Sequence, residues 1–482
     1  MKKLIIIILA VTATSVNLNG QTSGDALRYS RIIYSGTSRF VGMGGAFGAV
    51  GADFSTLAIN PAGIGLYQSS EISLTLAPVI SNSQSDYYGS ISTDNKVNFS
   101  LGNFGFIFTI KPSKNKSGGL KNFNFGFGMN RQNDFNNKVY ISGENPTSSM
   151  IQSYVNVLNT DGAPPSDYPF DIGLAYDCNL IYQDSLSGRY LCDARYGGVR
   201  QSKIINSYGS INEMDFSFGG NFNDKLYFGI TIGVPFIRYY ENSLYQESDN
   251  ADTIPEFNYA KYWYSLQTHG TGVNFKAGII YRPLNWFRVG LSVHTPTWYP
   301  SMQDEWFSSM ESNFTTTAWN STRYSPIGNY SYQLVTPFRA TCGLAFTLGQ
   351  YGLISADYEY VNYSQARFTS SRDNFSEINR EIKNSFQSWG NIRLGTEWRI
   401  QDFRIRGGFA YYSNAYTGNI NNNQRYQASG GLGYRGRYFF ADVSYVWSMT
   451  EEDYYLYDAS MVDPSHNTYY THTIATSIGI RF

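Results

Sequence analysis

Residues 473–482 alternate strictly between two kinds of side chain, and this pattern constrains the fold more than any other feature of the chain. One parity holds Ile474, Thr476, Ile478, Ile480 and Phe482. The other parity holds only small or polar residues and one arginine. Alternation with a period of two predicts a β-strand with one apolar face. In a membrane barrel, that face meets lipid and the opposite face lines the lumen.

Runs of the same kind recur along the chain, and fourteen of them are about as long as the 9–11 residues that a tilted strand needs to cross a bilayer. They lie near 70–81, 96–111, 121–141, 202–220, 224–240, 260–282, 286–297, 330–349, 351–368, 388–400, 403–414, 424–435, 437–450 and 469–482. Short turns alternate with long polar connections, as at the two rims of an outer-membrane barrel. The pattern predicts an all-β fold, with residues 70–482 as a 14-stranded antiparallel transmembrane β-barrel in the bacterial outer membrane.

The longest connection, residues 142–201, is predicted to be a long external loop that caps the barrel. Segments near 149–159 and 170–181 have the pattern of short amphipathic helices. Another external connection is predicted near 82–95. Cys178 and Cys192 flank part of the long loop and can form a disulfide in an oxidising compartment. The cysteines lack CxxC spacing, so we predict no metal and no cofactor.

The composition and the N-terminus agree with a secreted membrane barrel. Aromatic residues make up 17% of the chain, and no later stretch reaches the roughly 20 apolar residues of a membrane helix. Lys2 and Lys3 precede an apolar run too short to span a bilayer, so residues 1–20 are predicted to be a signal peptide. The sequence has no basic stripe, so we predict no nucleic-acid partner. A soluble, secreted all-β protein is the alternative.

Residues 21–69 lie between the predicted signal peptide and the first strand, and they are rich in Gly, Ala and Ser. A segment of this size cannot bury a hydrophobic core of its own. It needs the barrel around it. We therefore predict an N-terminal hatch inside the lumen.

Three features together resemble the FadL/TodX family of outer-membrane transporters. They are the Gly/Ala-rich N-terminal segment, the Asn60-Pro61-Ala62 triplet just before the first strand, and fourteen strands that end in Phe482. A terminal aromatic residue also resembles the signal read by the barrel-insertion machinery, a predicted partner during biogenesis. The resemblance implies a 14-stranded barrel with an N-terminal hatch that moves long-chain fatty acids or aromatic hydrocarbons.

The resemblance also implies a mechanism and a ligand. A hydrophobic small molecule is slowed by the polar lipopolysaccharide layer, is captured in an external apolar groove and passes to a pocket inside the barrel. A kink in the third strand opens the wall, and the solute leaves sideways into the outer-membrane lipid down its gradient. Sideways exit is physically reasonable, because hydrocarbon is the most favourable place for an apolar solute.

The third predicted strand, 121–141, loses its apolar alternation between residues 130 and 137. Polar residues interrupt it there, namely Asn130, Arg131, Asn133 and Asp134. This interruption is a candidate wall kink. The alternative is a strand that simply leaves the membrane at this point.

The triplet Asn60, Pro61 and Ala62 is a candidate hatch motif that ties the N-terminal segment to the wall. Pro61 fixes its backbone φ and lacks an N–H, and Asn60 can hydrogen-bond nearby backbone. The alternative is an ordinary Asn-Pro turn that leads into the first strand.

Charged residues of both signs have the parity of the lumen face. Arg393, Glu397, Arg399, Arg404, Arg406, Asp357 and Glu359 are the main members. We interpret them as a paired lumen network that anchors the hatch, since buried charges require partners. An ion-selective pore is the alternative. No nucleophile motif accompanies the histidines or the paired carboxylates, so we predict no enzyme activity.

The leading hypothesis is therefore passive transport of hydrophobic small molecules. A non-transport role as a barrel component of a type IX-like secretion system is the main alternative. A haemin-binding receptor is the third hypothesis, although a TonB-driven receptor would need about 22 strands.

Overall fold

The computed structural model describes residues 21–112, 119–194, 197–418 and 420–482. The predicted signal peptide, residues 1–20, lies outside the described residues.

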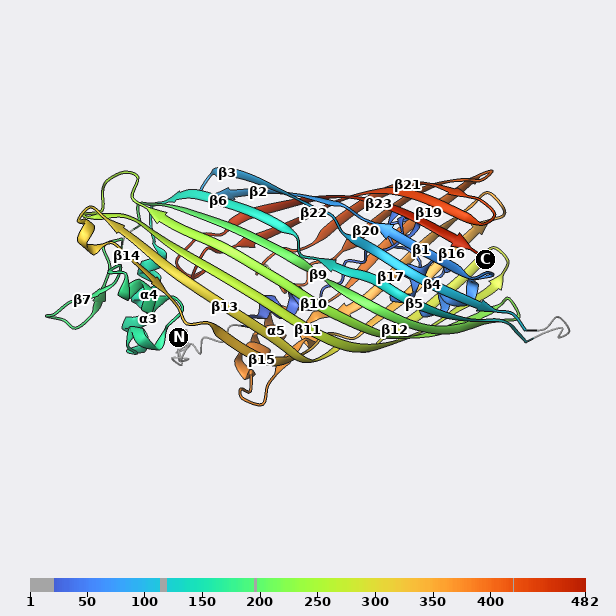
Figure 1. The fold of residues 1–482 in the computed structure, drawn as a ribbon, viewed down its shortest axis with the longest axis horizontal. Coiled ribbons are helices and arrows are strands. Elements are labelled where there is room, and N and C mark those ends of the chain that lie inside the picture. The colour runs from blue at the N-terminus through green and yellow to red at the C-terminus, as the bar shows by residue number, and fades with distance from the viewer. Residues whose placement is uncertain (1–20, 113–118, 195–196, 419) are drawn as a thin grey trace, which may run out of the picture.

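The described chain forms a closed, 14-stranded antiparallel β-barrel (Figure 1), which confirms the predicted fold class. Closure is made between the two ends of the strand order, where Glu71 pairs with Arg481 and Leu76 with Thr476. In chain order the barrel strands are β1–β2 (Glu71–Leu76, Val79–Tyr87), β3–β4 (Ser90–Asn98, Leu101–Ile110), β5–β6 (Leu120–Asp134, Asn137–Asn145), β9 (Val199–Phe222), β10 (Leu226–Ser248), β11 (Phe257–Leu284), β12–β13 (Phe287–His294, Trp298–Phe314), β14–β16 (Ser321–Tyr324, Gly328–Val335, Arg339–Leu348), β17–β18 (Gly352–Asn362, Arg367–Thr369), β19 (Ser388–Ile400), β20 (Phe403–Tyr412), β21 (Arg425–Arg435), β22 (Phe439–Tyr454) and β23 (Ser465–Arg481).

The alternation read from the sequence decides which side chains face outward. On β10, Phe228, Ile230 and Ile232 are exposed, whereas the residues between them are buried. Large apolar side chains are exposed in the same way on the other barrel strands. An exposed apolar band around a closed barrel is the surface that a lipid bilayer covers. No helix in the described part of the chain is long and apolar enough to span a membrane.

The barrel strands extend further than the apolar runs, and the predicted loop at 82–95 is wrong. β2 and β3 continue through this region and meet in a tight hairpin at Tyr88 and Gly89, both with positive φ. Such two-residue turns suit the right-handed twist of paired strands. The segment is polar on both faces, so it carries no apolar marker even though its backbone remains paired.

One end of the barrel carries a cap, which the structure describes over residues 146–194. It contains α3 (Met150–Asp161), η3 (Pro165–Asp167), α4 (Ile172–Asp177) and the small hairpin β7–β8 (Tyr182–Gln183, Tyr190–Leu191). Both helices lie near the same end of the barrel (Figure 1). Their apolar side chains pack in one core with the ends of β10, β11 and β13. Cys178 is a buried free thiol, so the disulfide with Cys192 that the sequence allows is absent from the described structure. Burial raises the pKa of the Cys178 thiol to about 11.

Shorter elements line the remaining connections. η4 (Thr317–Trp319) follows β13, and η5 (Tyr363–Gln365) separates β17 from β18. Helix α5 (Ser376–Ser385) packs against β18 and η5 and also contacts α1.

The N-terminal segment, residues 21–69, consists of α1 (Ser23–Ser30), α2 (Ser38–Gly42), η1 (Phe54–Ala58) and η2 (Pro61–Leu66). Most of it is buried against inward-facing residues of the barrel strands. Gly44 shows how tight this packing is. It has φ +62°, and a Cβ there would lie 2.8 Å from the Phe409 backbone nitrogen. Only glycine fits such a conformation and such a close backbone approach.

Candidate functional site

Three neighbouring strands of the wall are interrupted in the same part of the barrel. β1 ends before β2 at Ala77, β3 ends before β4 at Ser100, and β5 ends before β6 at Phe135. The first two strands stay joined, because Ala77 N donates to Ser100 O at 2.8 Å and Ser100 Oγ donates to Ala77 O at 2.5 Å. The second and third strands do not stay joined.

Strand pairing between the second and third strands stops at the pair Asn103 and Asn130. Toward the cap from this pair, β3 is paired only with β2, and β6 only with β9. The described structure thus has a gap in the hydrogen-bonded wall between β3 and β6. We call this region the wall gap.

β6 lies on the inner side of the β2–β3 hairpin rather than beside it in the wall. Ser83, an inward-facing residue of β2, donates through Oγ to Lys138 O of β6 at 2.8 Å. Lys96 of β3 meanwhile donates through Nζ to Ser207 O of β9 at 2.7 Å. β3 and β9 therefore contact each other directly, although β6 pairs with β9 at this level.

The N-terminal segment supplies hydrogen-bond partners to the backbone at the wall gap. Ile33 N donates to Gln132 O at 2.8 Å, and Ser35 N donates to Arg131 O at 3.1 Å. Asn133 Nδ2 donates to Arg31 O at 3.1 Å. Exposed backbone at membrane depth must find partners inside the protein, and here the residues around Ile33 provide them.

The four residues of the candidate kink all lie at this interruption. A register shift between β5 and β9 falls between Arg131 and Asn133. Arg131 forms an ion pair with Asp134 at 2.5 Å. Asn130 points the other way along the lumen face, and its Nδ2 donates to Asp215 Oδ2 at 2.8 Å.

A buried polar cluster holds the kinked strand from the inner face. Lys276 forms ion pairs with Glu213 and with Asp215, the latter at 3.1 Å. Gln132 Nε2 donates to Glu213. Gln132 and Lys276 are not among the site residues predicted from the sequence. Their inward parity was the available signal, but parity alone does not say which inward side chains meet.

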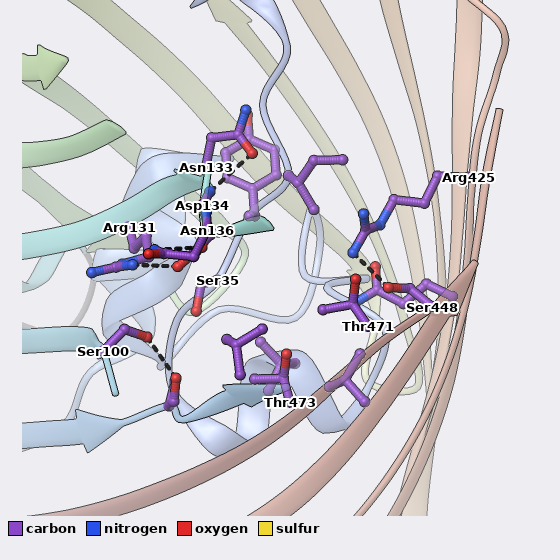
Figure 2. Close-up of a pocket in the computed structure, with 17 residues that line it drawn as sticks. Ser35, Ser100, Arg131, Asn133, Asp134, Asn136, Arg425, Ser448, Thr471 and Thr473 are labelled. Carbon is purple, nitrogen blue, oxygen red and sulfur yellow. Dashed lines mark hydrogen bonds and ion pairs between the residues drawn. The ribbon is translucent and has the colours of Figure 1, made fainter. Parts of the chain in front are cut away.

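Two neighbouring cavities that share lining residues lie behind the wall gap. The first, which we call the gap cavity, has a volume of about 110 Å³ and is drawn in Figure 2. It is bounded by the strand interruptions, by Ile33–Ser35 and by β21–β23. In Figure 2, Arg131 and Asp134 lie on one side and Arg425 on the other. The second, the inner cavity, has a volume of about 350 Å³ and extends to α1. Both cavities are lined by Arg425 and Thr471.

A chain of ion pairs joins the N-terminal segment to the opposite wall. Arg39 of α2 pairs with Glu397 at 3.0 Å, and Arg406 joins Glu397 to Asp442, each at 2.7 Å. Burial alone would lower the pKa of the Arg39 guanidinium, but the Glu397 carboxylate raises that pKa above its ordinary value.

A second set of contacts completes this anchor. Arg393 pairs with Glu359 at 2.8 Å and lies 4.0 Å from Asp357. Asp357 Oδ2 accepts from Gly48 N at 2.8 Å. Arg339 pairs with Glu359 at 2.9 Å and donates to Ser30 O.

Two members of the predicted lumen network take no part in it. Arg399 and Arg404 bond to the Gln401 carbonyl oxygen at 3.1 and 3.0 Å, at the turn between β19 and β20. Both have the inward parity, but they lie at the end of their strands. Parity specifies the face of a strand and not the depth along it.

The Asn60-Pro61-Ala62 triplet begins η2 and contacts the wall. Asn60 Oδ1 accepts from Ala62 N at 3.1 Å, and Pro61 occupies the first turn, where a missing N–H costs nothing. Asn60 Nδ2 donates to Gly48 O at 2.6 Å and to Ile279 O of β11 at 3.3 Å. The Asn60 side chain is fully buried.

A third cavity lies in the cap, outside the barrel lumen. It has a volume of about 310 Å³ and is lined mainly by apolar and aromatic side chains of α3, α4 and the neighbouring strand ends. Met150, Val157 and Ile172 contribute apolar surface, and Asp171 contributes a carboxyl group. Burial raises the pKa of the Asp171 carboxyl, although backbone hydrogen bonds act in the opposite direction.

Among the described residues, no group of three or more His, Cys, Asp and Glu side chains is placed to hold a metal ion.

Comparison with known proteins identifies relatives by structure only. No protein-family model matches the chain, and no curated protein matches its sequence. Solved structures do match. The Pseudomonas putida toluene transporter TodX superposes with a TM-score of 0.54 at 12% identity, covering 94% of this chain and 100% of that one. A Pseudomonas aeruginosa FadL homologue gives 0.53 at 11% identity, with 94% and 100% covered. The CymD monoaromatic hydrocarbon channel gives 0.52 at 12% identity, with 93% and 98% covered.

These likenesses confirm at the level of the fold the resemblance to the FadL/TodX family that the sequence indicates. The closed barrel and its apolar outer band make the chain a bacterial outer-membrane β-barrel.

Proposed function

We propose that this chain is a passive outer-membrane channel for hydrophobic small molecules, and that it is not an enzyme. The observation that carries the proposal is the wall gap between β3 and β6 with the gap cavity directly behind it. A closed barrel without such a gap offers a solute only an axial route. A gap in the wall offers a sideways route into hydrocarbon, which is favourable for an apolar solute.

The external apolar cavity is the proposed capture site. It lies in the cap, where Tyr154, Val157 and Ile172 form an apolar surface. Such a surface binds apolar solutes that have crossed the lipopolysaccharide layer, because burying their surface removes it from water. The solute then moves to the inner cavity and the gap cavity.

The N-terminal segment is the proposed hatch. Ion pairs fix it to one wall, and its backbone at Ile33 and Ser35 fills the wall gap with hydrogen bonds. Exit of a solute requires these few bonds to break, while the rest of the hatch stays in place. The solute classes consistent with the related folds are aromatic compounds and long-chain fatty acids.

A reversible cross-link across the gap tests this route. Ser35 Oγ lies 3.4 Å from the position of a Cβ on Gly102, so Ser35→Cys with Gly102→Cys brings two thiols together. The three native cysteines are first replaced by serine. The chain is expressed in a Gram-negative host without its own hydrocarbon and fatty-acid channels, and uptake of radiolabelled toluene and oleate is measured.

Oxidation of the double variant should abolish uptake of any transported solute, and reduction should restore it. Each single-cysteine variant serves as a matched control and should be insensitive to oxidant. Uptake that persists through the oxidised cross-link would exclude exit through the gap. Failure of the unmodified chain to increase uptake of either solute would argue against transport altogether.

The alternative functions receive less support. A barrel that serves only as a secretion component is expected to have a filled lumen. The gap cavity and the inner cavity argue against this role. Haemin binding would require an available histidine near a large pocket. His294, the buried histidine of β12, is bonded to the Ile59 carbonyl oxygen.

A further inference from the structure

The inner cavity contains charged side chains that do not pair with one another. Arg28 pairs with Asp25, and Asp134 pairs with Arg131. The remaining charges on the cavity wall belong to Arg31 of the hatch, Arg425 of β21 and Glu452 of β22. In the described part of the chain, none of these three has an oppositely charged group within 4 Å.

Neutral groups satisfy these three side chains only in part. Arg31 Nη2 donates to Asn423 O at 2.6 Å, and Arg425 Nη2 donates to Ser448 Oγ at 2.5 Å. Arg425 Nε is shielded from solvent and has no hydrogen-bond partner among the described residues. The same holds for Thr450 Oγ1 on the neighbouring strand. Glu452 accepts one hydrogen bond, from the Tyr469 hydroxyl at 3.0 Å. The cavity therefore offers two cationic groups and one anionic group with unused capacity.

The adjoining gap cavity shares Arg425 with the inner cavity, and its other two charged residues, Arg131 and Asp134, pair with each other. The apolar part of its lining lies next to the strand interruptions and consists of Ile33, Val41, Ala77, Val79 and Val446. A molecule that occupies both cavities would meet the unpaired charges at one end and this apolar surface at the other. The apolar end would be the one nearer the wall gap.

We propose that the ligand of these cavities is an amphiphile with a zwitterionic head group. This inference rests on the proposed function and adds a charged amphiphile to its solute classes. The anionic group of the ligand pairs with Arg31 and Arg425, and its cationic group pairs with Glu452. Its apolar tail lies in the gap cavity and points toward the membrane.

The three charges rank the possible head groups. A neutral head leaves all three charges unpaired, and a cation meets two repelling guanidinium groups. An anion pairs with the guanidinium groups but meets repulsion from Glu452. A zwitterion satisfies both signs, and each charged hydrogen bond from Arg31 or Arg425 to its anionic group changes affinity by roughly tenfold or more.

Probes that share one tail isolate the head group. The mature chain in neutral maltoside is titrated with dodecyl-dimethylglycine betaine, dodecanoate, dodecanol and dodecyltrimethylammonium by calorimetry. We expect the betaine to bind at least about tenfold more tightly than dodecanol, and the cation to bind most weakly. Equal affinities, the absence of binding by every probe, or tighter binding of dodecanoate than of the betaine would overturn the proposal.

Variants then assign the charges. Arg31→Gln and Arg425→Gln should each weaken the betaine and dodecanoate about tenfold and leave dodecanol unchanged. Glu452→Gln should weaken the betaine while dodecanoate binds more tightly. Arg404→Gln, at the rim, is the matched control and should change nothing. Heat-modifiable migration on gels verifies that each barrel is folded.

The outcomes separate this inference from the proposed function. Toluene uptake that is blocked by the oxidised cross-link, together with no head-group preference, would refute the zwitterionic ligand and keep the channel. Absence of toluene uptake together with absence of a head-group preference would refute the channel itself. A uniform loss of affinity for all four probes in Arg425→Gln would assign that residue a structural role and count against the proposal.

Discussion

The proposed hatch, residues 21–69, contacts the barrel wall in two different ways on its two sides. On the network side, formed by β16–β22, buried ion pairs and close backbone contacts hold it, as at Arg39 and Gly44. On the gap side, where the strands are interrupted at Ala77, Ser100 and Phe135, it is held near Ile33 by a few backbone hydrogen bonds next to a cavity. Removing one partner of a buried ion pair costs far more than breaking a single neutral hydrogen bond.

This difference indicates which side can open. A hatch held equally on all sides would have to leave the barrel as one body. A hatch with a strongly held side and a weakly held side can release the wall gap locally while the remainder stays in place. The predictions below weaken each side in turn.

The largest effect is expected on the network side. Arg406 is fully buried between Glu397 and Asp442, so Arg406→Ala leaves two carboxylates with fewer partners. We expect a loss of about 3–5 kcal/mol in the free energy of unfolding. Urea unfolding in lipid vesicles, followed by tryptophan fluorescence, measures it. Arg404→Ala, two residues away at the rim, should change stability by less than about 0.5 kcal/mol. Equal losses in both variants would contradict the anchoring role.

An intermediate effect is expected at the hatch motif. Asn60→Ala removes the cap of η2 and the donor to Gly48 and Ile279, and should cost about 1–2 kcal/mol. Asn60→Asp keeps the acceptor that caps Ala62 N but turns a buried carboxylate oxygen toward the Gly48 and Ile279 carbonyl oxygens. Because a buried charge without a partner is costly, the aspartate variant should be less stable than Asn60→Ala in the same unfolding experiment. An alanine variant as stable as the native chain would show that the triplet is only a turn.

The barrel could be predicted from the sequence because lipid imposes the alternation. Wherever a strand crosses the apolar band, outward residues such as Ile230 must be apolar, and the run can be counted. Beyond the band, water replaces lipid and this requirement disappears. The paired hairpin around Tyr88 was therefore missed, as was helix α5, which buries only Ile382.

The candidate site was predictable in part for the same reason. Polar residues at 130–134 interrupt an apolar run, and this interruption is visible in the sequence itself. The partner of that interruption cannot be read in this way. Ile33 contacts Gln132 through backbone atoms, which any side chain permits. The depth of Arg399 and Arg404 also escapes a pattern that records only parity.

The smallest effect on stability is expected on the gap side, where the effect on permeability should be largest. Asp134→Asn removes the charge that pairs with Arg131 but keeps an acceptor oxygen at the same position, and should cost about 1 kcal/mol. Because the pair borders the gap cavity, its loss should loosen the kinked strand and increase the uptake rate of radiolabelled toluene. Arg200→Gln removes the exposed pair with Glu144 on β6 and β9 and is the matched control, with no expected change in uptake. Slower uptake in Asp134→Asn with unchanged stability would mean that the pair shapes the pathway instead of closing it, and the comparison between the two sides would fail.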